Sequence, residues 1–214
     1  DTNALSLGTG DLTVSGASTQ VSVDITGGDL VFNTPVVLGG AGTRTLTGTT
    51  SVDFDSTLNG GGINLAVDSP ITTFGAAVTN LVDLTTDAPG TTAITSAITS
   101  TGVLTFNDDV TLSANVSGST ATFGDTLTVT GGNRTVATSG ASSFAGIEAD
   151  GSARTLIINS TGTTTLGGTI NDSDLSLTTN AAGTTAITSA ITDSGTLTFN
   201  DDVTLSANVS GSTA

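Results

Sequence analysis

The stretch LTFNDDVTLSANVSGSTA occupies Leu104–Ala121 and recurs unchanged at Leu197–Ala214. Within it, LTF and VTL place apolar residues on either side of a polar one, the period-two pattern of a short β-strand with one buried face. Asn, Asp, Ser and Gly, which favour turns, separate these segments. The stretch therefore predicts strand, turn, strand, turn, and its recurrence predicts a repetitive fold.

The identical stretch belongs to a longer repeat of roughly 90 residues. A shift of 93 places lays 90–121 over 183–214 with few mismatches. We therefore predict one repetitive domain over 1–214, with long units at roughly 12–104 and 104–197 and a third unit begun at 197–214. Because the chain ends inside its own repeat, we expect it to be a piece of a longer array.

The composition excludes several classes of function. The net charge is −16, and the three basic residues are all arginines. Electrostatic binding to nucleic acid or to an anionic membrane surface is therefore excluded. The chain has no His, Cys or Lys, which removes the usual nucleophile–base arrangements and disulfides. No apolar run is long enough to span a bilayer, so we expect no membrane insertion.

The phenylalanines follow a local rule. In most cases the aromatic residue closes an apolar segment, a small turn residue follows it, and an aliphatic residue opens the next segment four places after the Phe. The segments that show this are Phe32–Val36, Phe54–Leu58, Phe74–Val78, Phe106–Val110, Phe123–Leu127 and Phe199–Val203. The rule predicts that each Phe ends a strand just before a corner of the fold.

Two fold classes fit a chain of short strands. We predict an all-β parallel β-helix (β-solenoid) of about ten short three-stranded coils, because the strands recur about every six or seven residues. The alternative is a tandem array of Ig-like β-sandwiches of about 90 residues, whose strands normally recur every 8–12 residues. The spacings of the Phe residues are not multiples of one coil length, so either the coils vary or Phe lies on more than one face.

Three Thr-, Ser-, Gly- and Asn-rich segments carry a resemblance. The segments GTTAITSAIT, LTFNDDVTLSAN and TLTVTGGNRTV resemble the repeats of large bacterial surface proteins of the filamentous haemagglutinin-like adhesin and autotransporter passenger type. This resemblance implies a secreted or cell-anchored protein that works as an adhesin, a coat or a matrix component.

The acidic segments are candidate sites. Asn107-Asp108-Asp109 and its copy Asn200-Asp201-Asp202 offer oxygen ligands for Ca²⁺, although neither an EF-hand loop nor a GGxGxD repeat is present. The plainer interpretation is a solvated turn, with Asn in the left-handed conformation and two exposed carboxylates. Paired carboxylates for glycoside hydrolysis are offered by Asp53/Asp55, Asp108/Asp109 and Asp172/Asp174, and by Glu148.

A flat threonine array of the ice-binding kind is a further possibility for a Thr-rich solenoid. The Thr rows do not hold one register along the sequence, and we therefore expect no such array.

These observations lead to one predicted function. We assign no catalytic, cofactor-binding or metal-binding residue and predict that the chain is not an enzyme, with Ca²⁺ at the acidic turns as a weaker possibility. We predict an extracellular structural protein of a bacterial surface fibre, coat or matrix (a biofilm, for example), with itself as partner in a homopolymer or lattice and surface or matrix polysaccharide as a second partner. The alternatives are the stalk of an adhesin whose tip lies outside this chain, and a polysaccharide-active β-helix.

Overall fold

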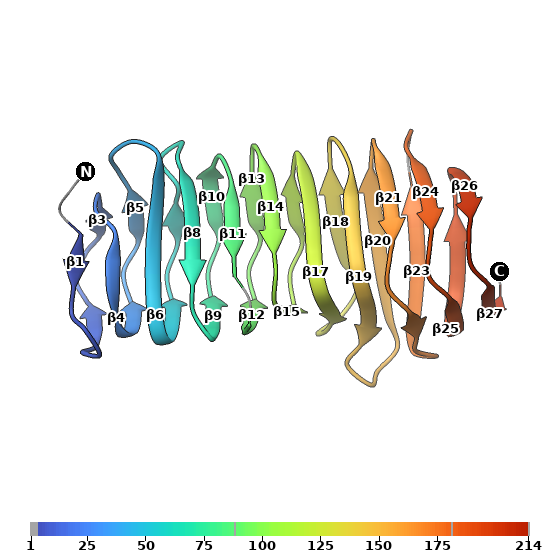
Figure 1. Cartoon of the computed structure of the whole chain (residues 1–214), viewed down its shortest axis with the longest axis horizontal. Coiled ribbons are helices and arrows are strands. Elements are labelled where there is room, and N and C mark those ends of the chain that lie inside the picture. The colour runs from blue at the N-terminus through green and yellow to red at the C-terminus, as the bar shows by residue number, and fades with distance from the viewer. Residues whose placement is uncertain (1–3, 88, 181, 214) are drawn as a thin grey trace.

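The computed structural model describes residues 4–87, 89–180 and 182–213, and these form a rod of stacked coils (Figure 1). All strand pairs in this part of the chain are parallel, and none of its elements is a helix. The parallel β-helix prediction is confirmed. The Ig-like alternative is wrong, because its strands would pair antiparallel.

Each coil contributes one strand to each of three faces, which we call face 1, face 2 and face 3. Face 1 consists of β3 (Thr19–Val21), β5 (Val36–Leu38), β7 (Leu58–Asn59), β10 (Val78–Leu81), β13 (Ile98–Ser100), β16 (Val116–Gly118), β18 (Arg134–Thr138), β20 (Arg154–Ser160), β23 (Leu175–Asn180) and the second part of β25 (Ile191–Phe199).

Face 2 begins with β1 and ends with β26. It consists of β1 (Leu5–Ser6), the first parts of β4 (Ile25–Phe32) and β6 (Thr43–Phe54), β8 (Asn64–Asp68), β11 (Leu84–Thr86), β14 (Val103–Phe106), the first parts of β17 (Thr120–Val129) and β19 (Ser142–Ala149), β21 (Thr163–Leu166), β24 (Thr184–Ile187) and β26 (Asp202–Leu205).

Face 3 completes the triangle. It consists of β2 (Leu12–Val14), the second parts of β4 and β6, β9 (Ile71–Phe74), β12 (Thr91–Ile94), β15 (Asp109–Leu112), the second parts of β17 and β19, β22 (Ile170–Asn171), the first part of β25 and β27 (Val209–Thr213). Four strands therefore bend across the corner between faces 2 and 3.

The core runs along the inside of the rod and is formed by the alternate residues of each strand. In β14, for example, Leu104 and Phe106 are fully buried while Thr105 between them points outward. The same alternation in every coil leaves one continuous core of Val, Ile, Leu, Ala and Phe. Since each coil covers its neighbours, burial of this apolar surface is the main source of stability.

The phenylalanines form two stacks on different faces. Phe32, Phe54 and Phe74 stack on face 3, with ring centroids 5.2 and 5.5 Å apart. Phe106, Phe123 and Phe144 stack on face 2, at 5.2 and 5.1 Å. Phe199 lies on face 1, opposite Thr179. The rule that Phe closes a strand holds for β4, β6, β9, β14 and β25, whereas β17 and β19 continue past their Phe.

The irregular Phe spacing therefore has two causes. One is the change of face between Phe74 and Phe106 and again before Phe199. The other is that the coils vary in length, from 17 residues where Val36 lies opposite Thr19 to 22 residues where Phe54 lies opposite Phe32.

The two copies of LTFNDDVTLSANVSGSTA lie on different faces. In the first copy, LTF is on face 2 and VTL on face 3, in β14 and β15; in the second copy, LTF is on face 1 and VTL on face 2, in β25 and β26. Counting strand segments from β14 to the second part of β25 gives 14 steps for the 93 residues between Leu104 and Leu197. Because 14 is not a multiple of three, the identical stretch returns after four and two-thirds coils, turned by one face.

Candidate functional site

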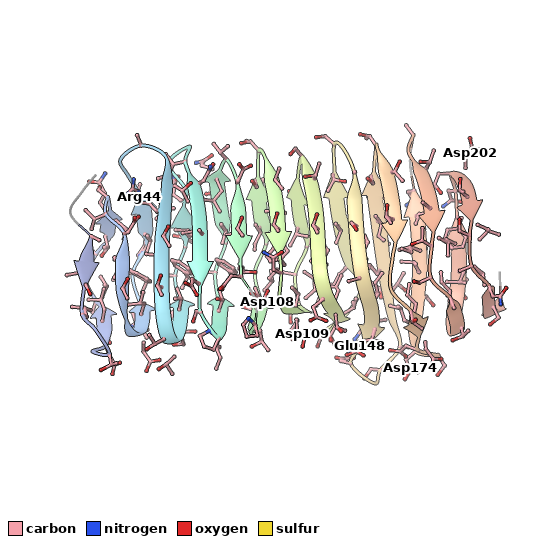
Figure 2. The ribbon with its side chains drawn as sticks, in the orientation of Figure 1. Arg44, Asp108, Asp109, Glu148, Asp174 and Asp202 are labelled. Atoms are coloured by element: carbon pink, nitrogen blue, oxygen red, sulfur yellow. The ribbon has the colours of Figure 1, made fainter. Side chains whose placement is uncertain are left out.

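The acidic turn at Asn107–Asp109 lies at the corner between faces 2 and 3, where the chain passes from β14 to β15 (Figure 2). Its middle residue is not exposed. Asp108 is only 2% exposed, and its two carboxylate oxygens accept hydrogen bonds from Thr86 Oγ1 at 2.8 Å and Thr92 Oγ1 at 2.7 Å. Both threonines belong to the preceding coil, so Asp108 ties one coil to the next.

The prediction of a solvated turn with a left-handed Asn is therefore wrong in two respects. Asp108 points into the rod, and among the described residues Asn80 is the one non-glycine residue with a positive φ. Asn107 instead donates from Nδ2 to the carbonyl of Thr86 at 3.0 Å. Asp109 is exposed as predicted, and its Oδ1 accepts the backbone N–H of Thr126 in the next coil at 3.2 Å.

The second copy of the turn repeats the threonine contacts of this carboxylate, although Asp201 is only partly buried. Asp201 accepts hydrogen bonds from Thr179 Oγ1 at 2.9 Å and from Thr185 Oγ1 at 2.9 and 3.0 Å. These partners are 93 places after Thr86 and Thr92, yet the second turn lies at the corner between faces 1 and 2. Figure 2 places Asp109 at the lower edge of the rod and Asp202, its counterpart, at the upper edge. The Thr–Asp–Thr contact therefore depends on the register between neighbouring coils and not on the face.

Burial changes the pKa of the Asp108 carboxyl. Loss of water around the side chain raises the pKa of the Asp108 carboxyl above its usual range, while the hydrogen bonds from Thr92 and Thr86 act in the opposite direction. The protonated carboxyl is thus favoured in the folded chain compared with the unfolded chain.

Other acidic and amide side chains serve as corner acceptors. Asp83 Oδ1 accepts the backbone N–H of Val103 at 2.7 Å, and Asn115 Oδ1 accepts that of Thr135 at 2.9 Å. Each contact joins a corner to the following coil, where the β ladder has no partner for that N–H. Many of the carboxylates and amides of this acidic chain therefore satisfy backbone donors at corners.

The remaining candidate carboxylates for hydrolysis make local contacts. Asp53 accepts from Ser51 Oγ at 2.7 Å, and Glu148 accepts from Thr128 Oγ1 at 2.9 Å. Asp172 accepts the backbone N–H groups of Ala149, at 2.6 Å, and Asp174, at 2.9 Å. Asp55 and Asp174 are exposed. These contacts hold corners and neighbouring coils in place, and they do not bring the candidate carboxylates together in one cleft.

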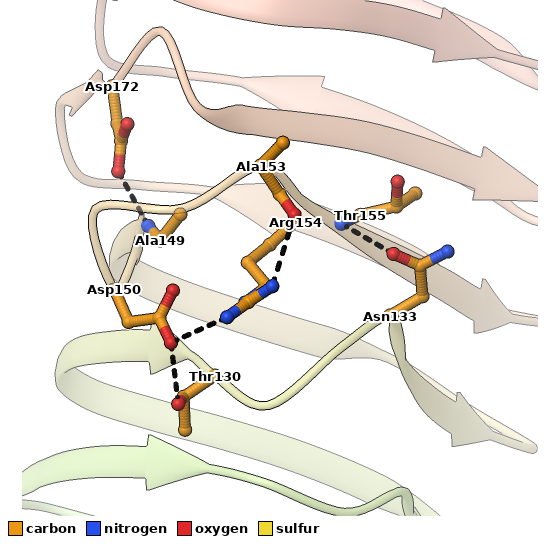
Figure 3. Close-up of polar contacts among 8 residues, drawn as sticks. All are labelled: Thr130, Asn133, Ala149, Asp150, Ala153, Arg154, Thr155 and Asp172. Atoms are coloured by element: carbon orange, nitrogen blue, oxygen red, sulfur yellow. Dashed lines mark hydrogen bonds and ion pairs between the residues drawn. The ribbon is translucent and has the colours of Figure 1, made fainter.

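A protruding loop between β19 and β20 carries an ion pair (Figure 3). Arg154 Nη2 lies 2.9 Å from Asp150 Oδ2, which also accepts from Thr130 Oγ1 at 2.7 Å. The hydrogen bond from Arg154, followed by that from Thr130, lowers the pKa of Asp150 to about 2. The three residues clamp the loop onto the coil below it.

No group of three or more acidic residues lies close enough to hold a metal ion in the described part of the chain. At the predicted calcium turn, Asp108 faces inward to threonine hydroxyls, and Asp109 faces outward to a backbone N–H. The two carboxylates therefore point to opposite sides of the strand. Ca²⁺ at this turn gains no support from the geometry, because the ligands diverge.

A register of small side chains does run along face 2, contrary to the expectation that the Thr rows drift. The central outward position of successive strands is occupied by Thr45, Ala66, Thr85, Thr105, Thr122, Ser143, Thr165, Ala186 and Thr204. This column is not visible in the sequence, because the coils differ in length and its members are therefore not evenly spaced along the chain. Neighbouring outward positions are mixed, as at Asp68 beside Ala66, so one regular column stands on an otherwise irregular face.

No helix in the described residues is long and apolar enough to cross a membrane. Comparison with known proteins adds no relative: no protein-family model, no curated protein and no solved structure matches this chain.

Proposed function

We propose that this chain is a structural rod of a bacterial surface fibre, coat or matrix, which is built by association of the chain with copies of itself. The observation that supports the proposal is that polar side chains hydrogen-bond within the rod. The carboxylates at Asp108, Asp83 and Asp172 hydrogen-bond to neighbouring coils or turns, so part of the acidic composition serves the construction of the rod. About ten coils at a strand spacing of about 4.8 Å give a rod roughly 50 Å long.

The extracellular location rests on the sequence. A Thr-, Ser- and Gly-rich acidic chain without cysteine resembles the repeats of large bacterial surface proteins. A parallel β-helix suits such a setting, because backbone hydrogen bonds join neighbouring coils along most of the three faces.

A non-catalytic role is part of the same proposal. The carboxylates at Asp53, Asp172 and Glu148 make structural contacts of their own, and inward-facing Asp108 is covered by Thr86 and Thr92. A polysaccharide-active β-helix would need two carboxylates facing one substrate.

The test is electron microscopy of the purified chain together with immunogold labelling of intact cells that carry its gene. We expect rods that associate into fibres or sheets, and gold on unpermeabilised cells. Rods that stay single at all protein concentrations would favour the adhesin stalk. Labelling confined to permeabilised cells would overturn the surface role.

A further inference from the structure

Face 2 has no charged outward residue on five neighbouring strands, although the chain carries a net charge of −16. These strands are β14, β17, β19, β21 and β24. Each turns three residues outward, as β21 does with Thr163, Thr165 and, at its corner, Gly167. All of these positions are exposed or half-buried and are filled by Thr, Ser, Ala, Gly, Val or Asn. We call this surface the neutral patch.

The carboxylates of the same coils lie beside the neutral patch. Asp109 and Asp125 lie at the corner between faces 2 and 3, and Glu148 points outward from face 3. The acidic flanking positions of face 2 itself, such as Asp68 and Asp83, belong to strands outside the patch. Like charges that meet across an interface oppose binding. The neutral patch is therefore a surface on which two copies of this acidic chain meet without opposed carboxylates.

The neutral patch is regular as well as uncharged. Its central residues Thr105, Thr122, Ser143, Thr165 and Ala186 lie directly opposite one another in successive strands. Small side chains in register form an even surface, because none stands far above its neighbours. Sheets that pack face to face lie about 10 Å apart, and an even surface suits a second sheet of the same kind.

The other two faces are less suited to such a contact. Face 3 has Asp53 and Glu148 in its central outward column. Face 1 carries the longer amide side chains of Asn159 and Asn180, and the protruding loop between β19 and β20 borders it. In Figure 1 the strands of face 2 lie toward the viewer, whereas that loop projects from the lower edge of the rod. Face 2 therefore offers the most accessible uncharged sheet.

We infer that face 2 is the lateral contact between two copies of this chain, with the neutral patch of one rod packed face to face against the same patch of the other. This contact deepens the proposed function and rests on it for self-association. Because the same surface serves both partners, the two rods are related by a twofold axis.

Charge selects the direction of the second rod. Gly102, Gly140 and Gly162 lie at the corner between faces 1 and 2, which is uncharged beside the neutral patch, whereas Asp109 and Asp125 lie at the corner between faces 2 and 3. A twofold axis along the rods makes them parallel and places the acidic corner of each opposite the uncharged corner of the other. Antiparallel rods would bring the two acidic corners together. The parallel pair is therefore favoured.

The area of face 2 is sufficient for a stable pair. About ten strands at about 4.8 Å, each about five residues of about 3.3 Å wide, give a face of roughly 800 Å². Two parallel copies would bury roughly twice that area, the size of a standard protein–protein interface. The neutral patch forms about half of this surface.

The first test uses sedimentation velocity on the 214-residue chain and three matched variants. Thr165→Asp places a charge at the centre of the contact, and we expect it to raise the Kd of the dimer by about tenfold or more. Thr111→Asp on face 3 and Ser117→Asp on face 1 add the same charge elsewhere and are expected to leave the Kd unchanged. Circular dichroism checks that all three are folded. An equal loss in the three variants would overturn the assignment of the contact to face 2.

Cross-linking tests the direction of packing, because the chain has no cysteine of its own. In parallel rods each central residue faces its own copy, so Thr105→Cys alone and Thr165→Cys alone are expected to form dimers with a bis-maleimide that spans the sheet spacing of about 10 Å. Thr111→Cys, on face 3, is the control and should stay monomeric. If Thr105→Cys cross-links only when it is mixed with Ala186→Cys, the rods are antiparallel and the proposed direction is wrong.

Salt and chelation test the role of the carboxylates. Parallel packing brings Asp83 of one rod near Asp87 of the other at the rim of the contact, since both belong to the coil of β11. Salt that screens this repulsion is expected to strengthen the association. The association is also expected to persist in a chelator. Dimers that require calcium would place the contact on the acidic corners and overturn the proposal.

The outcomes separate this contact from the proposed function. Fibres that persist unchanged in Thr165→Asp would show that the rods associate through another surface, which overturns the face 2 contact and leaves the structural role intact. A chain that forms no assembly at any concentration or salt would overturn self-association and the contact together.

Discussion

Asp108 is a carboxylate buried at a corner, held by the hydroxyls of Thr86 and Thr92. Burying an ionised group costs free energy even when it is hydrogen-bonded. At the acidic turn, burial of the carboxylate lowers the stability of the fold, while its hydrogen bonds fix the register between coils.

The replacement Asp108→Asn tests this cost. Burial raises the folded-state pKa of Asp108 above the value of 3.8 expected in the unfolded chain. Its favourable contribution to stability is thus fully present below about pH 3.8 and is lost as the pH rises through the folded pKa. At pH 7 the neutral amide is expected to stabilise the chain and to flatten the pH dependence of urea unfolding.

Asp109→Asn is the matched control for that measurement. It removes one negative charge from the same turn, but from an exposed side chain. If the two variants shift the unfolding midpoint equally across pH 4–7, the effect comes from net charge and burial of Asp108 is irrelevant.

The hydroxyl donors can be tested separately. Thr92→Val keeps the side-chain shape and removes one donor to Asp108, which we expect to destabilise the chain by about 1–3 kcal/mol at pH 7. Thr92→Val in the Asp108→Asn background should cost less, because the remaining amide is uncharged. Equal costs in the two backgrounds, measured by urea unfolding, would rule out a coupling between Thr92 and the carboxylate.

Among the elements, the strands that carry Phe32, Phe54 and Phe74 form one of the two aromatic stacks of the core. Phe54 is fully buried in the middle of the stack. Phe54→Ala is expected to destabilise the chain by about 3–5 kcal/mol, since it leaves a cavity between two rings. Phe54→Leu should cost less, because Leu112 and Ile94 occupy the same ladder in other coils.

Phe199→Leu serves as the comparison for this position. Phe199 is only partly buried and lies opposite Thr179, with no ring above or below it. Phe199→Leu should therefore change the melting temperature little. A loss as large as that of Phe54→Ala would contradict the view that the stack itself supplies the stability.

The strand pattern was predictable from sequence, while the face of each strand was not. The alternation in LTF and VTL and the turn residues after Phe are local, and they identify strands and corners correctly. Assigning a face requires counting strands in threes through coils of 17 to 22 residues, and a single long strand such as β17 hides one corner. Burial of Asp108 was missed for the same reason, because its partners Thr86 and Thr92 are brought to it only by the coil register.

At the scale of the whole molecule, each coil contacts only the coils above and below it. Removing 75–94, the twenty residues that separate Phe74 from its partner Ile94, takes out one complete coil. Phe74 would then face Leu112, and Ile98 would face Leu58, so every ladder keeps an apolar partner. We expect this shortened chain to keep its circular dichroism spectrum and a cooperative transition, but to melt below the full chain, because Thr86 and Thr92, the hydrogen-bond donors to buried Asp108, are lost with the coil.

Removing 75–84 supplies the contrast, because ten residues are about half a coil. The strands that follow would meet the wrong face, with turn residues set against ladders. A marked loss of cooperativity is expected on heating. Equal tolerance of both deletions would mean that the coils do not hold a fixed register.

The one-face turn between the two copies has a geometric consequence for any array that continues it. Three units of 93 residues contain 42 strand segments, or 14 complete coils, before the identical stretch returns to its first face. At about 4.8 Å per coil, this corresponds to a pitch of roughly 67 Å. The same outward residues would thus follow a helical path around the fibre and would face three directions in turn. Each fibre would then offer equivalent contacts to neighbours on all three sides, which allows fibres to pack side by side into bundles.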